Sequence, residues 1–478
     1  MESRLKRCVL ALILVPLLGT ADAGAETAAP NQGIRHQNPA VDAFVGARIV
    51  TAPGEIVEDG ILVVRDGRIE AVGSDLEIPA DAVVHDLDGK SVYPGFIDPY
   101  TEYGLGHLDR LNPPHEEEGP KYEGNREGAD SWNDAVHAER RWVEELRPDD
   151  ETASKLRKQG ITSVHSSKMD GIFRGRGFVT GLREGLANEV VRRPHGLHLL
   201  SWDKGSSEQS YPSSLMGSIA LIRQTLLDAD WYRRARDAHR RNPSLDSPEL
   251  NRPLEALAGY EGAFLFQVSD ELDLLRAGRI AREMDRPFVY VGTNREYQRL
   301  EEIRALDRPI VLPLHFPDKP AVGSLEEELD VTLADLRHWE RAPSNPSVLA
   351  ENGIEIAFTT HGLEDGEKLL GQVRKTIDRG LSEERALAAL TTVPANLLGV
   401  LEDSGTLEEG KRADFLIAEG NLFSEDGELL SVWGAVKGVG RIGQRLGFPD
   451  FLKDNRGESV PKVIVVELPH DVLLHVEP

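Results

Sequence analysis

The chain has 478 residues, of which 40% are hydrophobic and 28% are charged, and its formal net charge at pH 7 is −26. These proportions are those of a folded globular protein and exclude a disordered or fibrous chain. Because so negative a chain repels phosphate backbones and anionic lipid, we expect no nucleic-acid partner and no electrostatic docking to membranes.

The start of the chain has the pattern of a cleaved signal peptide. Three basic residues precede an apolar run over residues 8–19, and small residues follow it. The run is shorter than the roughly 20 residues that a membrane-spanning helix needs. We therefore predict a signal peptide at residues 1–25, a linker at 26–40, export to the periplasm and no membrane span. The only cysteine, Cys8, lies in the signal peptide, so we expect no disulfide in the mature chain.

Residues 41–92 have the pattern of short strands separated by turns. The Asp66-Gly67 pair between two apolar runs is typical of a β-hairpin with a two-residue loop. After residue 405 the chain returns to short strands, including one predicted at 462–468. We therefore predict a composite β-sandwich domain that is assembled from residues 41–92 and 405–478.

Between these two segments, helical patterns alternate with short apolar strands, as in a parallel α/β barrel. The clearest strand candidates occupy residues 163–165, 263–266, 288–291, 310–312 and 354–359. We predict an α/β fold, a (β/α)₈ TIM barrel over residues 93–404. Insertions are expected near 106–150, which is rich in charge, and near 200–257, which is mostly helical.

Sequence motifs stand at the two ends of this barrel segment. Residues 89–98 read G-K-x-x-x-P-G-F-I-D, at the point where the β-rich start enters the barrel. Residues 391–399 read T-x-x-P-A-x-x-L-G, and residues 405–414 read G-x-L-x-x-G-x-x-A-D. Together these motifs resemble the amidohydrolase superfamily, in particular its imidazolonepropionase-like branch. A weaker resemblance extends over residues 266–293.

The resemblance implies a hydrolase that acts on carbon–nitrogen bonds other than ordinary peptide bonds, often in cyclic amides. It also implies a divalent metal at the C-terminal mouth of the barrel. The usual ligands of the family are a His-x-His pair that ends strand 1, a His on strand 5, a His on strand 6 and an Asp on strand 8. Such a metal lowers the pKa of a bound water and polarises the scissile carbonyl.

Most positions that the resemblance assigns to these ligands hold other residues. Tyr100 and Glu102 stand at the His-x-His positions, and Gln267 stands at the strand 5 position. Val291 stands at the strand 6 position, and His361 stands where the Asp is expected. Phenol, amide and isopropyl groups do not replace imidazoles around zinc at neutral pH. We therefore predict no bound metal and no other cofactor.

Other residues offer two ways in which catalysis could persist. Glu102, His165, His315 and His361 form an alternative metal set, if all four side chains face the mouth of the barrel. Glu102 and His361 could also work without metal as a general acid/base pair. Against both, each histidine can equally be a hydrogen-bonded structural residue.

A ligand-binding role is predicted for Tyr100 and Gln267, and for two arginines in the glycine-rich segment 171–177. Backbone amides there, with Arg174 or Arg176, could hold an anion. The same glycines also fit a turn that needs their backbone freedom. The chain has no nucleotide-binding glycine loop and no serine-hydrolase elbow, so those two function classes lack support.

Our leading hypothesis is a catalytically degenerate member of the superfamily. It would bind a small molecule or serve as a partner subunit of an active paralogous amidohydrolase, and the resemblance also implies homo-oligomers. The alternative hypothesis is an active hydrolase of cyclic or linear amides. That enzyme would use zinc or another divalent metal in the non-standard site, or the Glu102–His361 pair.

Overall fold

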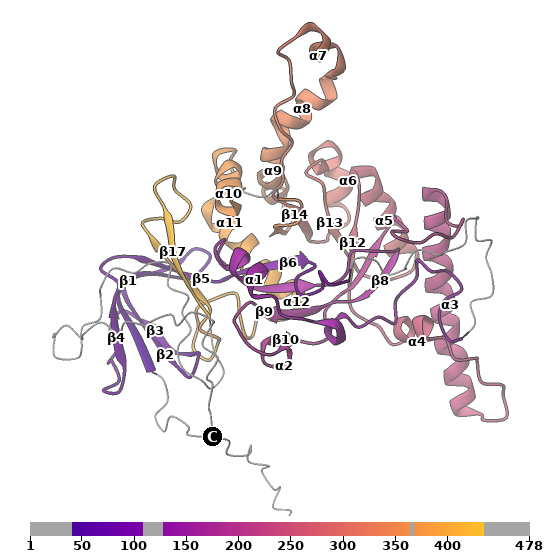
Figure 1. Ribbon diagram of the computed structural model, residues 1–478, viewed down its shortest axis with the longest axis horizontal. Coiled ribbons are helices and arrows are strands. Elements are labelled where there is room, and N and C mark those ends of the chain that lie inside the picture. Colours follow the sequence, from indigo (N-terminus) through magenta and orange to yellow (C-terminus); the bar gives the residue numbers. More distant parts are fainter. Residues whose placement is uncertain (1–40, 109–127, 364–367, 435–478) are drawn as a thin grey trace, which may run out of the picture. The chain divides into compact units, whose positions relative to one another are not determined.

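Figure 1 shows a computed structural model of the chain, which describes residues 41–108, 128–363 and 368–434. The predicted signal peptide, the linker, the strand at 462–468 and part of the first insertion lie outside the described residues. None of the helices in the described ranges combines the length and apolar character needed to cross a membrane.

One mixed sheet of seven strands joins residues from both ends of the described chain. Its strands are β1 (Val41–Ala52), β2 (Glu55–Arg65), β3 (Arg68–Gly73), β4 (Val83–Asp86), β5 (Ser91–Pro94), β16 (Phe415–Glu419) and β17 (Glu428–Trp433). Their order is β17-β16-β5-β1-β2-β3, with β4 paired to β1. The hairpin prediction is confirmed, because β2 and β3 pair antiparallel and are joined by Asp66 and Gly67. Both residues have the positive φ that such a loop requires.

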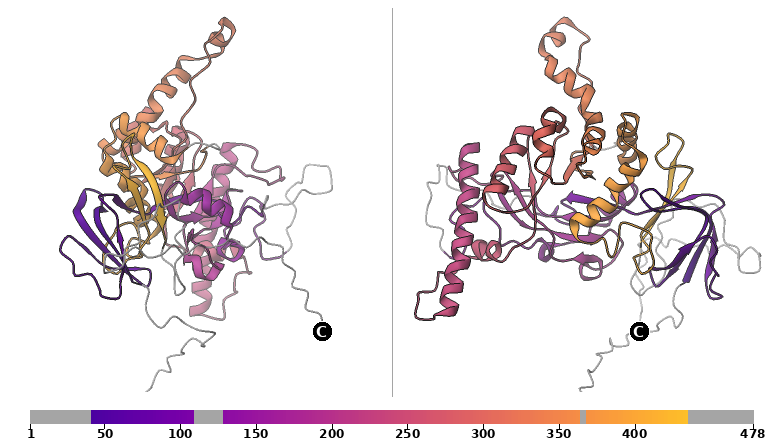
Figure 2. Two further views of the ribbon diagram at one scale, coloured as in Figure 1. Left: turned by 60° about the vertical axis from the view of Figure 1, so that its left-hand side comes forward. Right: turned by 180° about the vertical axis from the view of Figure 1, so that it is seen from behind.

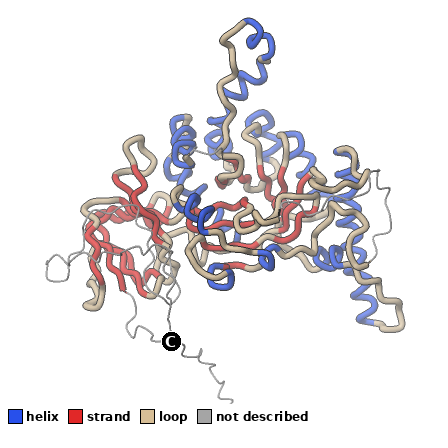
Figure 3. The backbone as a smooth tube through the Cα atoms, in the orientation of Figure 1, coloured by secondary structure: helices blue, strands red, loops and turns tan. Residues whose placement is uncertain are grey.

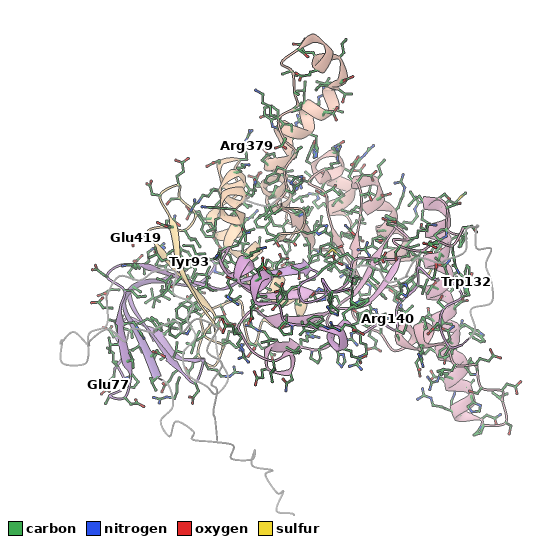
Figure 4. The ribbon with its side chains drawn as sticks, viewed as in Figure 1. Glu77, Tyr93, Trp132, Arg140, Arg379 and Glu419 are labelled. Carbon is green, nitrogen blue, oxygen red and sulfur yellow. The ribbon has the colours of Figure 1, made fainter. Side chains whose placement is uncertain are left out.

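The two halves of this sheet are held together by pairing and by packing. β16 pairs antiparallel with β5, and Phe415 lies opposite Pro94. Tyr93, labelled in Figure 4, donates a hydrogen bond from its hydroxyl to Asn421 Oδ1 at 3.2 Å. Its ring meets that of Phe423 edge-on, with centroids 6.0 Å apart. Segments more than 300 residues apart in sequence therefore form one folded unit.

The remaining strands form a four-stranded sheet in the order β10-β9-β7-β6 and a six-stranded sheet in the order β15-β14-β13-β12-β11-β8. Their bounds are β6 (Phe96–Thr101), β7 (Ile161–Ser166), β8 (Phe173–Arg176), β9 (Phe178–Gly181), β10 (Val191–Arg193), β11 (His198–Ser201), β12 (Phe264–Gln267), β13 (Phe288–Val291), β14 (Ile310–Pro313) and β15 (Ile356–Thr359). All five strand candidates for the barrel coincide with strands. β11 to β15 pair in parallel, whereas β9 pairs antiparallel to β7 and β8 antiparallel to β11.

The helices, drawn blue in Figure 3, alternate with these strands along the chain, and α5, α6, α9 and α10 flank β12 to β15 (Figures 1 and 2). The α-helices are α1 (Asp150–Arg157), α2 (Ala187–Val190), α3 (Leu215–Arg241), α4 (Arg252–Ala258), α5 (Glu271–Glu283), α6 (Leu300–Arg304), α7 (Leu325–Asp330), α8 (Leu333–Arg341), α9 (Asn345–Glu351), α10 (Leu369–Asp378), α11 (Glu383–Leu390) and α12 (Thr392–Leu398). The 3₁₀ helices are η1 (Trp142–Glu145), η2 (Glu296–Arg299) and η3 (Ala342–Ser344). α3 and α4 account for the helical prediction over 200–257.

A buried carboxylate joins the edges of the two smaller sheets. Asp98 of β6 accepts hydrogen bonds from Thr359 Oγ1 at 2.7 Å, Thr360 Oγ1 at 2.6 Å and Thr360 N at 2.9 Å. β6 and β15, the first and last strands of the predicted barrel, therefore lie side by side. The pairings of the described strands establish an α/β fold with mixed sheets, but they do not confirm a closed barrel of eight parallel strands.

Candidate functional site

A cavity of about 680 Å³ lies next to the C-terminal ends of β6 and β15. Its lining includes Tyr100 and Glu102 from β6 and the residues that follow it, and His361 from the residues that follow β15. Met169 and Asp149, the N-cap of α1, close it from other directions. The cavity therefore lies beside the loops that follow the C-terminal ends of the strands, which is where α/β proteins usually bind ligands.

Glu102 presents a carboxylate to this cavity. Its Oε1 accepts a hydrogen bond from Met169 N at 2.7 Å and lies 3.3 Å from Lys168 Nζ. These contacts hold the side chain in place while 37% of it stays exposed. Within the described ranges Oε2 has no hydrogen-bond partner, so it is available to a ligand.

His361 lines the same cavity as a neutral imidazole. Burial lowers the pKa of His361, and the charge of Arg174 lowers it further, against the opposing influence of Asp98 and Glu102. Its ring meets that of Tyr100 edge-on, with centroids 4.9 Å apart. No described residue hydrogen-bonds to its ring nitrogens, so the ring can accept a proton from a ligand or water.

A buried arginine connects two of the predicted ligand-binding residues. Arg174 is only 3% exposed. Its Nη1 donates to the hydroxyl of Tyr100 at 3.0 Å and to Oε1 of Gln267 at 2.7 Å, and its Nε donates to Gly171 O at 3.1 Å. Trp142 Nε1 fixes the backbone by donating to Arg174 O at 2.6 Å. Among the described residues no carboxylate pairs with this guanidinium.

Tyr100 is held as a neutral phenol by its surroundings. Burial raises the pKa of Tyr100, and the charge and hydrogen bond of Arg174 only partly oppose this. Since the hydroxyl oxygen accepts the bond from Arg174, its own proton remains available for donation. No acceptor for that proton is found within the described ranges. The hydroxyl is therefore a donor strengthened by a neighbouring positive charge.

His165 lies away from the cavity, as a structural residue of β7. Its ring is fully buried, with Nδ1 3.1 Å from Pro99 O and Nε2 accepting from Leu197 N at 3.2 Å. Burial lowers the pKa of His165 to about 4, so the ring is neutral at pH 7. Both ring nitrogens are already engaged. Gly177 and Gly196 pack against this ring, where a Cβ would stand 2.4 and 2.6 Å from Nε2.

The alternative metal set is not brought together. In the part of the chain that the structure describes, no group of three or more His, Cys, Asp or Glu side chains is placed to hold a metal ion. Of the proposed four residues, Glu102 and His361 share the cavity, whereas His165 and His315 do not line it. His315 lies beyond β14, where its carbonyl accepts from Asn294 Nδ2 at 3.3 Å.

The two arginines of segment 171–177 have different environments. Arg176 Nε donates to Gly196 O at 3.1 Å, and its guanidinium lies 5.3 Å from the centroid of the Tyr260 ring. Arg174 instead contacts Tyr100 and Gln267. The segment contains strand β8 (Phe173–Arg176), and Gly171 and Gly175 have a positive φ, which favours glycine. The two side chains therefore do not form one anion-binding loop.

Val291, at the position where the resemblance expects a strand 6 ligand, has apolar surroundings. Val291 of β13 pairs in register with Gln267 of β12. It packs with Leu265, Val289 and Val311 in a buried cluster that also contains Tyr100.

The connections between the predicted ligand-binding residues were not visible in the sequence. Sequence reasoning identified Tyr100, Gln267 and Arg174 separately but did not predict the hydrogen bonds between them. It also did not predict that Lys168 and Met169 contact Glu102. No sequence signal links these residues, because they come from different strands and loops.

Comparisons with known proteins find similarity to amidohydrolases and to imidazolonepropionases. A model described as the Amidohydrolase family matches residues 343–465. The imidazolonepropionase of Deinococcus radiodurans is 48% identical over 57 residues, which is 12% of this chain and 14% of that protein. That of Deinococcus deserti is 44% identical over 55 residues, again 12% of this chain and 14% of that protein. The chain thus spans 14% of the length of these curated relatives.

A solved structure extends the likeness to most of the chain. An amidohydrolase from Thermotoga maritima MSB8 superposes with a TM-score of 0.65 and 22% sequence identity. The superposition covers 83% of this chain and 98% of that one. At this level of identity the likeness shows a shared fold.

Proposed function

We propose that this chain is a member of the amidohydrolase superfamily, a hydrolase-like protein that binds a small polar molecule in its cavity without a resident metal ion. In this proposal β6, β7 and β11 to β15 belong to a distorted (β/α)₈ barrel, and the seven-stranded sheet belongs to a β-sandwich domain. The observation that most directly supports a metal-free site is the buried guanidinium of Arg174, which donates hydrogen bonds to both Tyr100 and Gln267.

Arg174 supports a metal-free site through its charge. The resemblance aligns Tyr100 and Gln267 with ligand positions on strands 1 and 5. A guanidinium between them repels a second cation. At a separation of about 4 Å and an effective dielectric constant of about 20, the repulsion energy is on the order of 4 kcal/mol per unit charge. The hydrogen bonds of Arg174 also use lone pairs of the phenol oxygen and the amide oxygen that a metal would need.

The remaining donors do not fit the metal that the superfamily implies. His165 has both ring nitrogens engaged by backbone groups. Among the described residues, no third His, Asp or Glu is placed with Glu102 and His361 to complete the three protein ligands of a catalytic zinc site. We therefore derive no chemical step through a metal.

The cavity offers matched groups for a small polar ligand. The hydroxyl of Tyr100 can donate a hydrogen bond, while the Glu102 carboxylate and the neutral His361 ring can accept one. A ligand that presents an oxygen to Tyr100, and N–H or ammonium groups to both Glu102 and His361, would satisfy all three. As further proposals, the mature chain is exported to the periplasm and assembles with itself or with an active paralogue.

The first test is the metal content of the purified mature protein, measured by elemental mass spectrometry before and after incubation with zinc and dialysis. We expect far less than one metal ion per chain in both samples. A stoichiometric metal that survives dialysis would overturn the metal-free site.

The second test is ligand binding, measured as the shift in melting temperature with a panel of small amides, amines and amino acids. A ligand present at about 100 times its Kd stabilises the folded state by about 2.7 kcal/mol. We expect the shift to be lost in Glu102→Gln and kept in Glu151→Gln, a matched change on the exposed face of α1. An equal shift in both variants would place the ligand elsewhere.

A second candidate function is metal-free hydrolysis by Glu102 and His361. The observation that favours it is that both side chains line one cavity and that the imidazole is neutral at pH 7. His361 would take a proton from water as the water oxygen adds to the amide carbonyl, and it would return that proton to the leaving nitrogen as the C–N bond breaks, while Glu102 orients the substrate. Amide hydrolysis that survives a chelator and is abolished in His361→Gln would support it, whereas activity that the chelator removes would exclude it.

A further inference from the structure

Two short helices between β14 and β15 form an arm that the other described residues do not cover. α7 and α8 extend away from the sheets in Figures 1 and 2. Ser324 and Thr332 cap them through capping boxes, which shows that both helices are locally specified. Leu329 and Leu333 are nevertheless 79% and 61% exposed. Such exposed leucines on an ordered element are typical of a binding surface.

We define the arm surface as Glu328, Leu329, Asp330, Leu333 and Leu336. Glu328 and Asp330 are exposed, and no cation among the described residues pairs with either. The stretch over residues 328–336 contains three acidic residues but no lysine or arginine. The arm surface is therefore both apolar and acidic.

A second uncovered apolar stripe lies on α3. One face of this helix is buried and carries Leu221, Leu226 and Tyr232. Leu227 and Trp231, one turn apart, point away from that face and are 52% and 54% exposed. The helix therefore leaves two large apolar side chains open to solvent.

Two arginines extend the exposed stripe of α3 towards the C-terminal end of the helix. Arg234 and Arg241 follow Leu227 and Trp231 at helical spacing, and both are exposed. Each donates from Nε to a backbone carbonyl of its own helix, and neither forms an ion pair with a carboxylate in the described ranges. We define the helix surface as Leu227, Trp231, Arg234 and Arg241. It is apolar and basic on a chain whose net charge is −26.

We propose that two copies of this chain associate by placing the arm surface of one copy on the helix surface of the other. Each surface offers exposed apolar side chains beside charges that have no ion-pair partner among the described residues, and the signs of those charges are opposite. Complementary charges steer encounter and fix register, while the leucines and Trp231 supply apolar contact. In Figures 1 and 2 the helices α7 and α8 stand apart from α3, so among the described residues the arm of one copy does not lie on its own α3.

This pairing is selective because of the overall charge. Two chains of net charge −26 repel each other over most of their surfaces, and the basic end of α3 is an exception. An anionic membrane would repel the acidic arm in the same way. Since every copy carries both surfaces, two contacts can form at once in a closed pair. The inference does not depend on the cavity or on its ligand.

The experiment is sedimentation equilibrium of the full mature chain over a range of protein and salt concentrations. We expect reversible self-association that weakens as salt is added, because salt screens the charged contacts. Leu329→Gln with Leu333→Gln, or Trp231→Gln alone, should raise the dissociation constant by about tenfold or more. Leu186→Gln, which alters an equally exposed leucine on neither surface, should leave it unchanged.

Charge reversal tests the pairing itself. Glu328→Arg with Asp330→Arg should weaken association, as should Arg234→Glu with Arg241→Glu. All four changes in one chain should restore it, because the signs are again opposite. A chain that stays monomeric at every concentration, or an association that all these variants leave unchanged, would overturn the proposal.

Discussion

The guanidinium of Arg174 and the hydroxyl of Tyr100 lie 3.0 Å apart in a buried hydrogen bond, and Tyr100 is one of the residues that line the cavity. The same Nη1 reaches Gln267 Oε1 at 2.7 Å. This places a permanent positive charge between strands β6 and β12, where the phenol and the amide hold it without a carboxylate among the described residues. The charge lowers the pKa of His361 and strengthens Tyr100 as a hydrogen-bond donor.

Replacing Arg174 should destabilise the protein. Arg174→Met removes the donor of three hydrogen bonds and leaves the buried oxygens of Tyr100, Gln267 and Gly171 unpaired. We expect a loss of about 2–3 kcal/mol of unfolding free energy, measured by urea denaturation. Arg176→Met, two residues away and partly exposed, should cost less. Equal losses in the two variants would contradict this account.

The buried His165 should make stability depend on pH below neutrality. Its pKa is lowered from 6.5 to about 4 in the folded state, so between these values the unfolded chain binds a proton that the folded chain does not. Stability is therefore fully present above about pH 6.5 and is lost as the pH falls towards 4. The loss should reach about 3 kcal/mol.

The measurement is the difference in unfolding free energy between the wild type and His165→Gln at a series of pH values. Taking the difference removes the contribution of the many surface carboxylates. We expect the difference to shrink as the pH falls from 7 to 4. A difference that stays constant over this range would show that His165 titrates normally.

Gly177 should not tolerate even a methyl group. A Cβ there would lie 2.4 Å from His165 Nε2 and 2.8 Å from Ser166 O, so the backbone would have to move. We expect Gly177→Ala to cost about 1–3 kcal/mol in urea denaturation. Gly106→Ala is the control, because a Cβ at Gly106 meets nothing within 4 Å. If both variants are equally stable, His165 does not pack as described.

Removing the Asp98 carboxylate should loosen the junction of β6 and β15. Asp98→Ala leaves the hydroxyl and the backbone N–H of Thr360 without their acceptor, whereas the hydroxyl of Thr359 can still donate to Tyr100 O at 2.9 Å. We expect a loss of about 2–4 kcal/mol and weaker ligand binding, because the junction positions Tyr100 and His361. Asp75→Ala, at an exposed position, is the control for both measurements. Unchanged hydrogen exchange at Thr360 N in Asp98→Ala would argue against this role.

Much of the fold could be predicted because its signals are local. The Asp66-Gly67 loop, the apolar runs at β12 to β15 and the helix α12 are each specified by neighbouring residues. The pairing of the remaining strands could not be predicted in the same way. β8, β9 and β10 pair antiparallel, and that choice depends on contacts between segments far apart in sequence.

The sequence by itself indicated the resemblance to the amidohydrolase superfamily and the alternation of strands and helices. It also determined which residues stand at the positions that the resemblance assigns to metal ligands. Only the tertiary structure decided how those residues act. It joined Arg174 to Tyr100 and Gln267, removed His165 from the site and left Glu102 and His361 at one cavity. The reason is that hydrogen bonds and charge interactions act over a few ångströms in space, and sequence separation does not record that distance.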